Sequence, residues 1–185
     1  QGLGANLASY RYEAQPGSYA LIVWLQRMTG WSALPAFSTL TWLACLAVIM
    51  ATAGLVSRLT QQPWAVCGLC LLLFQEAFAS GCFANTTMIA AALLTLGFLW
   101  VSYSKNTPQR LIAGVMLGLS AWMRFDVVLV FPAVILLVWE QPWKRAVSQA
   151  AMILGVALLV TASGLYFSNV DIHSILAAAT GHVGR

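Results

Sequence analysis

Three ionisable residues sit in or at the end of apolar stretches, where a charge is costly unless it is paired or faces water. Glu76 has Ser80 four residues later on the same helical face, and Arg124 and Asp126 close a later stretch. The planar fork of an arginine suits a phosphate or another anionic headgroup, and Asp126 would orient it. Glu76 would pack in the wall or contact a polar ligand. The residues predict either an outward-facing polar cavity that takes an anionic group or an internal ion pair that fixes helix packing.

The elements that carry these residues are apolar and long. The chain is 61% hydrophobic and 8% charged, with a mean hydropathy of +0.82, which excludes a soluble domain. Its net charge of +4 resides largely in short loops and does not indicate a nucleic-acid partner. We predict an all-α integral membrane protein, with a bundle over 38–168 of about six transmembrane helices. These are 38–57, 63–80, 86–104, 108–123, 126–139 and 146–168.

The loops between these stretches differ in charge in a way that predicts orientation. Lysine and arginine are retained on the cytoplasmic side, and alternate loops carry Arg58, then Lys105 and Arg110, then Lys144 and Arg145. The other loops, which carry Asn85, Arg124 and Asp126, then lie outside, as does the terminal segment 169–185. This pattern predicts a multi-pass protein of the cell (inner) membrane whose functional face is outside.

Residues 1–37 are predicted to form an outer loop that contains one short helix, 18–29, ending at Gly30. Such a helix is about 18 Å long and cannot span about 30 Å of hydrocarbon. We therefore expect it to lie in the outer interface with Trp24 facing lipid. Because the chain begins at Gln1 without a signal sequence, we expect it to be part of a longer protein whose preceding helix crosses the membrane.

Two short motifs are explained by packing. The pair Cys67-Gly-Leu-Cys70 lies near the cytoplasmic start of the second predicted span, away from the oxidising side, so buried thiols that fill space are favoured over a redox pair. Gly114 and Gly118 form a small-xxx-small pattern, for which internal helix packing is favoured over dimerisation.

Several segments resemble the GT-C glycosyltransferases of the aminoarabinose-transferase and protein-mannosyltransferase kind. The run Gln15-Pro16-Gly17-Ser18-Tyr19, followed by a short apolar helix, resembles their Lys/His-Pro-Pro-Leu-Tyr segment in the first outer loop. Glu76-(x)3-Ser80-(x)4-Asn85 and the run from Arg110 to Arg124 are similar to their third-to-fifth spans. The resemblance covers about residues 10–140. Two departures are Gly17 in place of the second proline and the lack of an arginine in 31–35.

The resemblance implies a membrane enzyme that takes a sugar from a polyprenyl-phosphate donor on the outer face. Such a reaction needs a carboxylate to deprotonate the acceptor and cations to steady the departing phosphate. Glu13 is the candidate catalytic base in this chain, although the family's leading acid would lie before Gln1. The candidate substrate-binding residues are Arg11, Gln15, Tyr19, Glu76, Asn85, Arg124 and Asp126. The expected partners are membrane lipid and the lipid-linked sugar. No cofactor is evident in the sequence. A bound divalent metal is compatible with this chemistry, but the sequence shows no cluster of ligands for it.

A second hypothesis belongs to another class, that of a non-catalytic membrane subunit that packs in a larger complex or binds lipid. The two hypotheses differ in what they predict upstream of Gln1. A native reading frame that extends upstream with a further span and an acidic pair would favour the enzyme over the subunit. A carrier is disfavoured because no span has paired Gly and Pro in its middle, and Pro132 stands alone.

Overall fold

The computed structural model describes residues 16–62, 65–66, 70, 86–139 and 142–168. Regular structure in these residues is entirely helical. In chain order the elements are α2 (Pro16–Thr29), α3 (Ala33–Thr60), α5 (Thr86–Tyr103), α6 (Thr107–Met123), the 3-10 helix η2 (Phe125–Val130), α7 (Ala133–Leu137) and α8 (Trp143–Phe167). Most of the second predicted span, 63–80, and the terminal segment 169–185 lie outside the described residues.

Two of the described helices can span a membrane by length and composition. α3 has 28 residues and α8 has 25, each with a mean hydropathy of 2.0 over its most apolar window. Only 22% and 28% of these windows are buried, so most of their apolar surface faces outward, including Leu43, Met50, Leu158 and Leu159. α5 and α6 are shorter, about 27 and 25 Å long by their rise per residue. The all-α prediction is confirmed for this part of the chain. Two of the six predicted spans correspond to helices that are long and apolar enough to cross a membrane.

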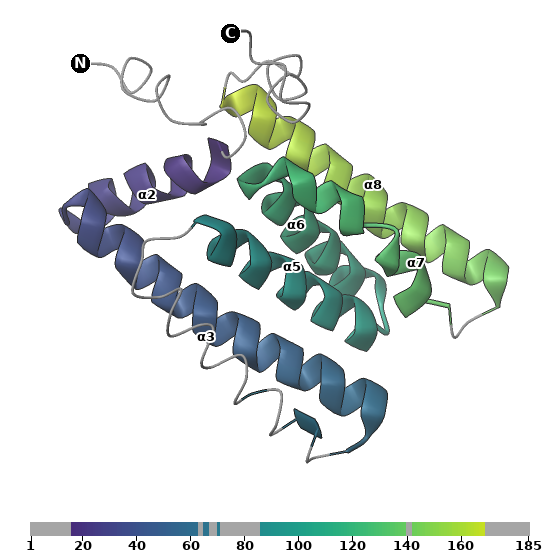
Figure 1. Ribbon diagram of the computed structural model, residues 1–185. Coiled ribbons are helices and arrows are strands. Elements are labelled where there is room, and N and C mark those ends of the chain that lie inside the picture. The colour runs from purple at the N-terminus through teal and green to yellow at the C-terminus, as the bar shows by residue number, and fades with distance from the viewer. Residues whose placement is uncertain (1–15, 63–64, 67–69, 71–85, 140–141, 169–185) are drawn as a thin grey trace, which may run out of the picture.

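The short helix predicted over 18–29 is confirmed, but it begins two residues earlier, because Pro16 and Gly17 form its first turn and do not precede it. The end of the helix has a clear cause. Gly30 adopts φ +70°, and its N–H donates to the Gln26 carbonyl at 2.9 Å. A left-handed residue of this kind closes a helix and redirects the chain, and glycine is the residue that adopts it without strain. α3 then begins at Ala33 and runs away from α2 at a steep angle (Figure 1).

The prediction of one continuous helix over 126–139 is wrong. The segment forms η2, a turn at Phe131 and Pro132, and the five-residue α7. Pro132 lacks a backbone N–H and cannot continue the hydrogen bonding of a helix that precedes it. Three valines in η2 add the lower helix propensity of β-branched residues. Pro132, which the sequence analysis set aside as a lone proline, is thus where the segment breaks.

The helices pack in an order set by their small residues. α6 lies between α5 and α8, and α3 packs on the other side of α5 (Figure 1). The core contains many alanines, which let helices approach closely: Ala36, Ala44, Ala51, Ala113, Ala121, Ala146, Ala150 and Ala157. α2 lies across the end at which α3 and α5 begin and α6 and α8 end (Figure 1). Arg58, Lys105 and Lys144 lie at or beyond the opposite ends of these helices.

The close packing of α6 on α8 depends on two glycines, as the small-xxx-small pattern predicts for internal packing. A Cβ at Gly118 would lie 2.5 Å from the Ala157 carbonyl oxygen, and one at Gly114 would lie 2.8 Å from that of Ile153. Thr161 Oγ1 donates to the Gly118 carbonyl at 3.1 Å across the same interface. The hypothesis of internal packing is therefore confirmed.

We expect Gly118→Ala to lower the thermal unfolding temperature of the protein in detergent. The added methyl meets backbone, which cannot rotate away, and overpacking of this kind typically costs about 1–3 kcal/mol. Gly155→Ala is the matched control, because nothing lies within 4 Å of a Cβ at that position of α8. An unfolding temperature for Gly118→Ala equal to or above that of the control would contradict the packing described here.

Candidate functional site

Arg124 lies at a corner of the chain. Its N–H donates to the Ser120 carbonyl at 2.9 Å and so caps α6, but its backbone is extended, with φ −147° and ψ 112°. η2 begins at the next residue. The side chain therefore projects from a break between two helices, and its direction is not set by a continuous helical repeat.

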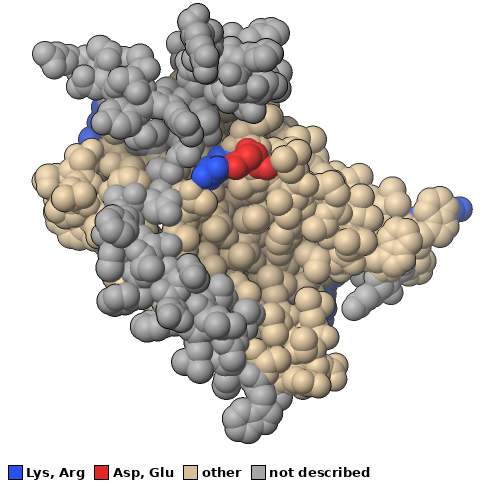
Figure 2. Space-filling view, viewed as in Figure 1, with Lys and Arg blue, Asp and Glu red and all other residues tan. Residues whose placement is uncertain are grey.

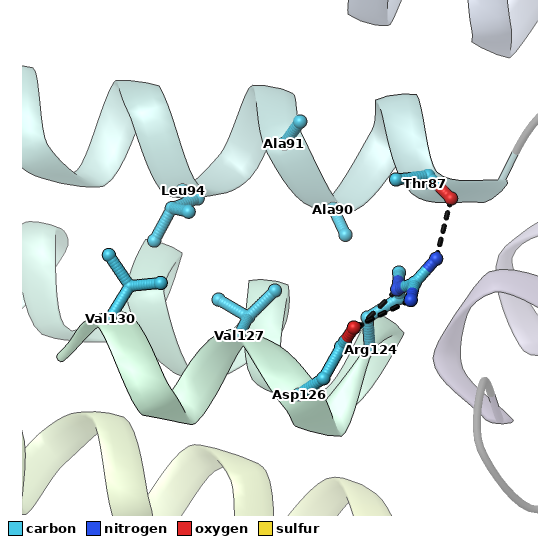
Figure 3. Close-up of a pocket in the computed structure, with 8 residues that line it drawn as sticks. All are labelled: Thr87, Ala90, Ala91, Leu94, Arg124, Asp126, Val127 and Val130. Atoms are coloured by element: carbon cyan, nitrogen blue, oxygen red, sulfur yellow. Dashed lines mark hydrogen bonds and ion pairs between the residues drawn. The ribbon is translucent and has the colours of Figure 1, made fainter.

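Three hydrogen bonds hold the guanidinium of Arg124 (Figure 3). Nε donates to Asp126 Oδ1 at 3.0 Å and Nη2 donates to Oδ2 at 2.6 Å, which is a bidentate ion pair. Nη1 donates to Thr87 Oγ1 at 2.6 Å, and Thr87 lies in the first turn of α5. The arrangement joins the beginning of α5 to the end of α6 and the start of η2.

The ion pair remains charged at neutral pH and partly exposed. Hydrogen bonds from Arg124 lower the pKa of the Asp126 carboxyl from its ordinary value, although partial burial opposes this effect. The Arg124 and Asp126 side chains are 28% and 58% exposed. Asp126 is the only acidic residue in the described part of the chain, so the red atoms beside blue ones in Figure 2 mark this pair.

Arg124 has donors left for a further ligand. A guanidinium carries five N–H donors, and the described residues accept three of them. Among the described residues, one N–H on Nη1 and one on Nη2 therefore have no acceptor. Two donors on neighbouring nitrogens match two oxygens of a phosphate or carboxylate, which is the geometry for which arginine is suited.

An apolar groove of about 270 Å³ begins at the ion pair. α5 contributes Ala90, Ala91 and Leu94 to its walls, and η2 contributes Val127 and Val130; Thr87, Arg124 and Asp126 form the polar end (Figure 3). The small alanines leave room between the helix and η2. The groove is therefore amphipathic along its length, with a cation at one end and hydrocarbon walls beyond it.

The structure brings together two of the predicted site residues, Arg124 and Asp126, in this one groove. Tyr19 lies in α2, but its side chain is outside the described part. The other predicted site residues lie outside the described residues altogether: Arg11, Glu13, Gln15, Glu76 and Asn85. The predicted meeting of Glu76 with Arg124 therefore stays a prediction.

Thr87 lines the groove but is not among the site residues predicted from the sequence. Positions 87, 90, 91 and 94 share one face of α5, and all but Leu94 are small. A face of small residues beginning with a hydroxyl is a signal that could have indicated a site on this helix. The apolar character of the whole stretch obscured it.

The described residues offer no obvious place for a metal. No group of three or more His, Cys, Asp or Glu side chains in the described part is arranged to hold an ion. Cys45 and Cys70 form no disulfide within the described residues. Within the described residues the chemistry of the site is therefore that of one oriented cation beside an apolar groove.

Comparisons of the chain with protein-family models, with curated proteins and with solved structures find no match.

Proposed function

We propose that the protein is a membrane glycosyltransferase of the GT-C type and that the groove receives the phosphate end of a polyprenyl-phosphate-linked sugar. The observation that supports this most is the position of Arg124, with two remaining N–H donors, at the head of an apolar groove. A ligand that fits both parts carries an anionic group joined directly to a hydrocarbon chain. A lipid phosphate has this chemistry.

The size of the groove limits how much of the lipid it holds. Pockets that enclose a whole drug-sized ligand have volumes of about 300–1,000 Å³. At about 270 Å³ the groove takes only the part of the chain next to the phosphate. The rest of the chain lies among membrane lipids along the exposed surface of the bundle.

The proposed roles of the two charged residues follow from their contacts. In sugar transfer the bond from the sugar to the phosphate oxygen breaks, and the departing phosphate gains negative charge that a cation stabilises. Arg124 supplies this cation. Asp126 is held by Arg124 through both oxygens, so it orients the arginine and is not the base. The base remains Glu13, as the resemblance implies.

The proposed orientation places the groove outside. The helix ends that carry Arg58, Lys105 and Lys144 lie opposite the end that carries Arg124. Because basic loops are retained in the cytoplasm, we infer that the groove opens on the outer face of the cell (inner) membrane.

We expect a cysteine at position 107 to be inaccessible from outside intact cells. In a variant without native cysteines, Thr107→Cys should react with a membrane-impermeant maleimide only after permeabilisation. Ser32→Cys, at the opposite end of the bundle, is the positive control and should react without permeabilisation; both residues are exposed. Labelling of position 107 from outside would reverse the orientation and contradict an outer site.

A second candidate function is that of a non-catalytic membrane subunit, in which the ion pair fixes packing. The observation that favours it is that Arg124 joins α5 to η2 through Thr87. Full-length protein in vesicles that contain a polyprenyl-phosphate-linked sugar separates the two functions. Sugar transfer supports the enzyme, and binding without transfer supports the subunit.

A further inference from the structure

Trp122, two residues before Arg124, is held between the backbones of two other helices. A Cβ at Gly17, in the first turn of α2, would lie 2.8 Å from Cδ2 of the indole. A Cβ at Gly164, near the end of α8, would lie 2.6 Å from Cγ. Both distances are shorter than a carbon contact allows, so the ring lies where only glycine permits two helices to approach it.

Polar contacts fix the ring and the residue beside it. Trp122 Nε1 donates to Ser168 Oγ at 3.0 Å, and Ser168 Oγ in turn donates to the Gly164 carbonyl at 2.7 Å. Ser18, which is fully buried, donates to Met123 Sδ at 3.5 Å. Both residues immediately before Arg124 are thereby tied to other helices.

These contacts matter because the backbone leaves helical geometry at Arg124. In a continuous helix, the direction of a side chain is set by the hydrogen bonds on both sides of it. Here the path of the chain on the α6 side depends on how firmly the last turn of α6 is held. The last turn of α6 is held at Trp122, where α6 contacts both α2 and α8.

We propose that Trp122 is a positioning residue for Arg124: its indole fixes the end of α6 between α2 and α8 and so directs the guanidinium toward the groove. The inference rests on the proposed binding of a lipid phosphate by Arg124. The alternative is that Trp122 only stabilises the fold. The two roles differ in whether the effect of Trp122 on binding passes through Arg124.

A double-mutant cycle tests this difference. Farnesyl phosphate is titrated against the full chain in detergent, with farnesol as the uncharged comparison, for wild type, Trp122→Phe, Arg124→Ala and the double variant. Trp122→Phe keeps a benzene ring but loses the pyrrole ring and with it the hydrogen bond to Ser168. Ser168→Ala removes the same bond without changing the ring, and serves where Trp122→Phe fails to fold. Trp139→Phe, at a tryptophan that is 59% exposed, is the matched control.

We expect Trp122→Phe and Ser168→Ala each to weaken farnesyl phosphate binding by about fivefold and to leave farnesol binding unchanged. In the Arg124→Ala background neither should weaken binding further, and Trp139→Phe should bind as wild type. An equal loss in both backgrounds, or no loss in wild type, would overturn the positioning role while leaving the proposed function intact. If Arg124→Ala itself binds as wild type, the proposed function is wrong and the positioning role fails with it.

Discussion

Arg124→Ala is expected to lower the affinity for farnesyl phosphate by about thirtyfold to a hundredfold and to abolish sugar transfer in the full-length protein. The substitution removes two charge-assisted hydrogen bonds to the phosphate, each worth about 1.5–3 kcal/mol before screening by solvent. It also leaves the Asp126 carboxylate without its cation beside the incoming anion. Both changes weaken binding of the phosphate group, and neither changes the contacts of the hydrocarbon chain.

The accompanying measurements separate binding from stability. Arg124→Lys keeps the charge but loses the planar fork, so its affinity should be intermediate. Farnesol binding should not change. The unfolding temperature should move little, because both side chains of the pair are partly exposed and such pairs contribute little to stability. Cys67→Ser should transfer nearly as wild type. Turnover at the wild-type rate in Arg124→Ala would instead contradict phosphate binding by Arg124 and support a packing role for the ion pair.

The helices were predictable where hydrophobicity and local signals agree. α3, α5, α6 and α8 lie on predicted apolar stretches, because a long apolar run satisfies its own backbone hydrogen bonds when it forms a helix. Gly30 marked the end of α2 because the left-handed conformation it adopts favours glycine. The break at Pro132 was visible in the sequence but was given too little weight. Valine-rich apolar runs alone do not distinguish a spanning helix from a 3-10 segment.

The site was only half predictable for a different reason. Arg124 and Asp126 are two residues apart, so their pairing is a local matter that a charge in an apolar stretch already indicates. The contact with Thr87 joins residues that are 37 positions apart in the sequence. It depends on the register in which α5 packs against η2. No pattern within either segment specifies that register. Long-range partners of a charged residue therefore had to come from the structure.

Gly17 shows how one apparent departure has a structural cause. It stands where the resembling family has a second proline, which weakened the resemblance at the sequence level. The close approach of Trp122 explains the glycine, because any residue with a Cβ would meet the indole there. The packing of α2 on α6 therefore accounts for the glycine at this position.

Ala91→Phe is expected to block the hydrocarbon part of the groove without disturbing Arg124. Ala91 is one of the residues by which α5 lines the groove, so a phenyl ring at this position takes up space that the chain next to the phosphate would fill. Excluding about two or three methylene groups from an apolar site costs about 2 kcal/mol. The affinity for farnesyl phosphate should therefore fall by about thirtyfold.

A second ligand tells a blocked groove from a damaged site. Methyl phosphate reaches Arg124 without entering the apolar part, so its weaker binding should be the same in Ala91→Phe and wild type. Ala151→Phe adds the same ring to the exposed surface of α8 and should leave both ligands unaffected. Wild-type affinity of Ala91→Phe for farnesyl phosphate would show that the chain does not lie in the groove. Loss of both ligands with a lowered unfolding temperature would show that the added ring had displaced η2, which carries Asp126.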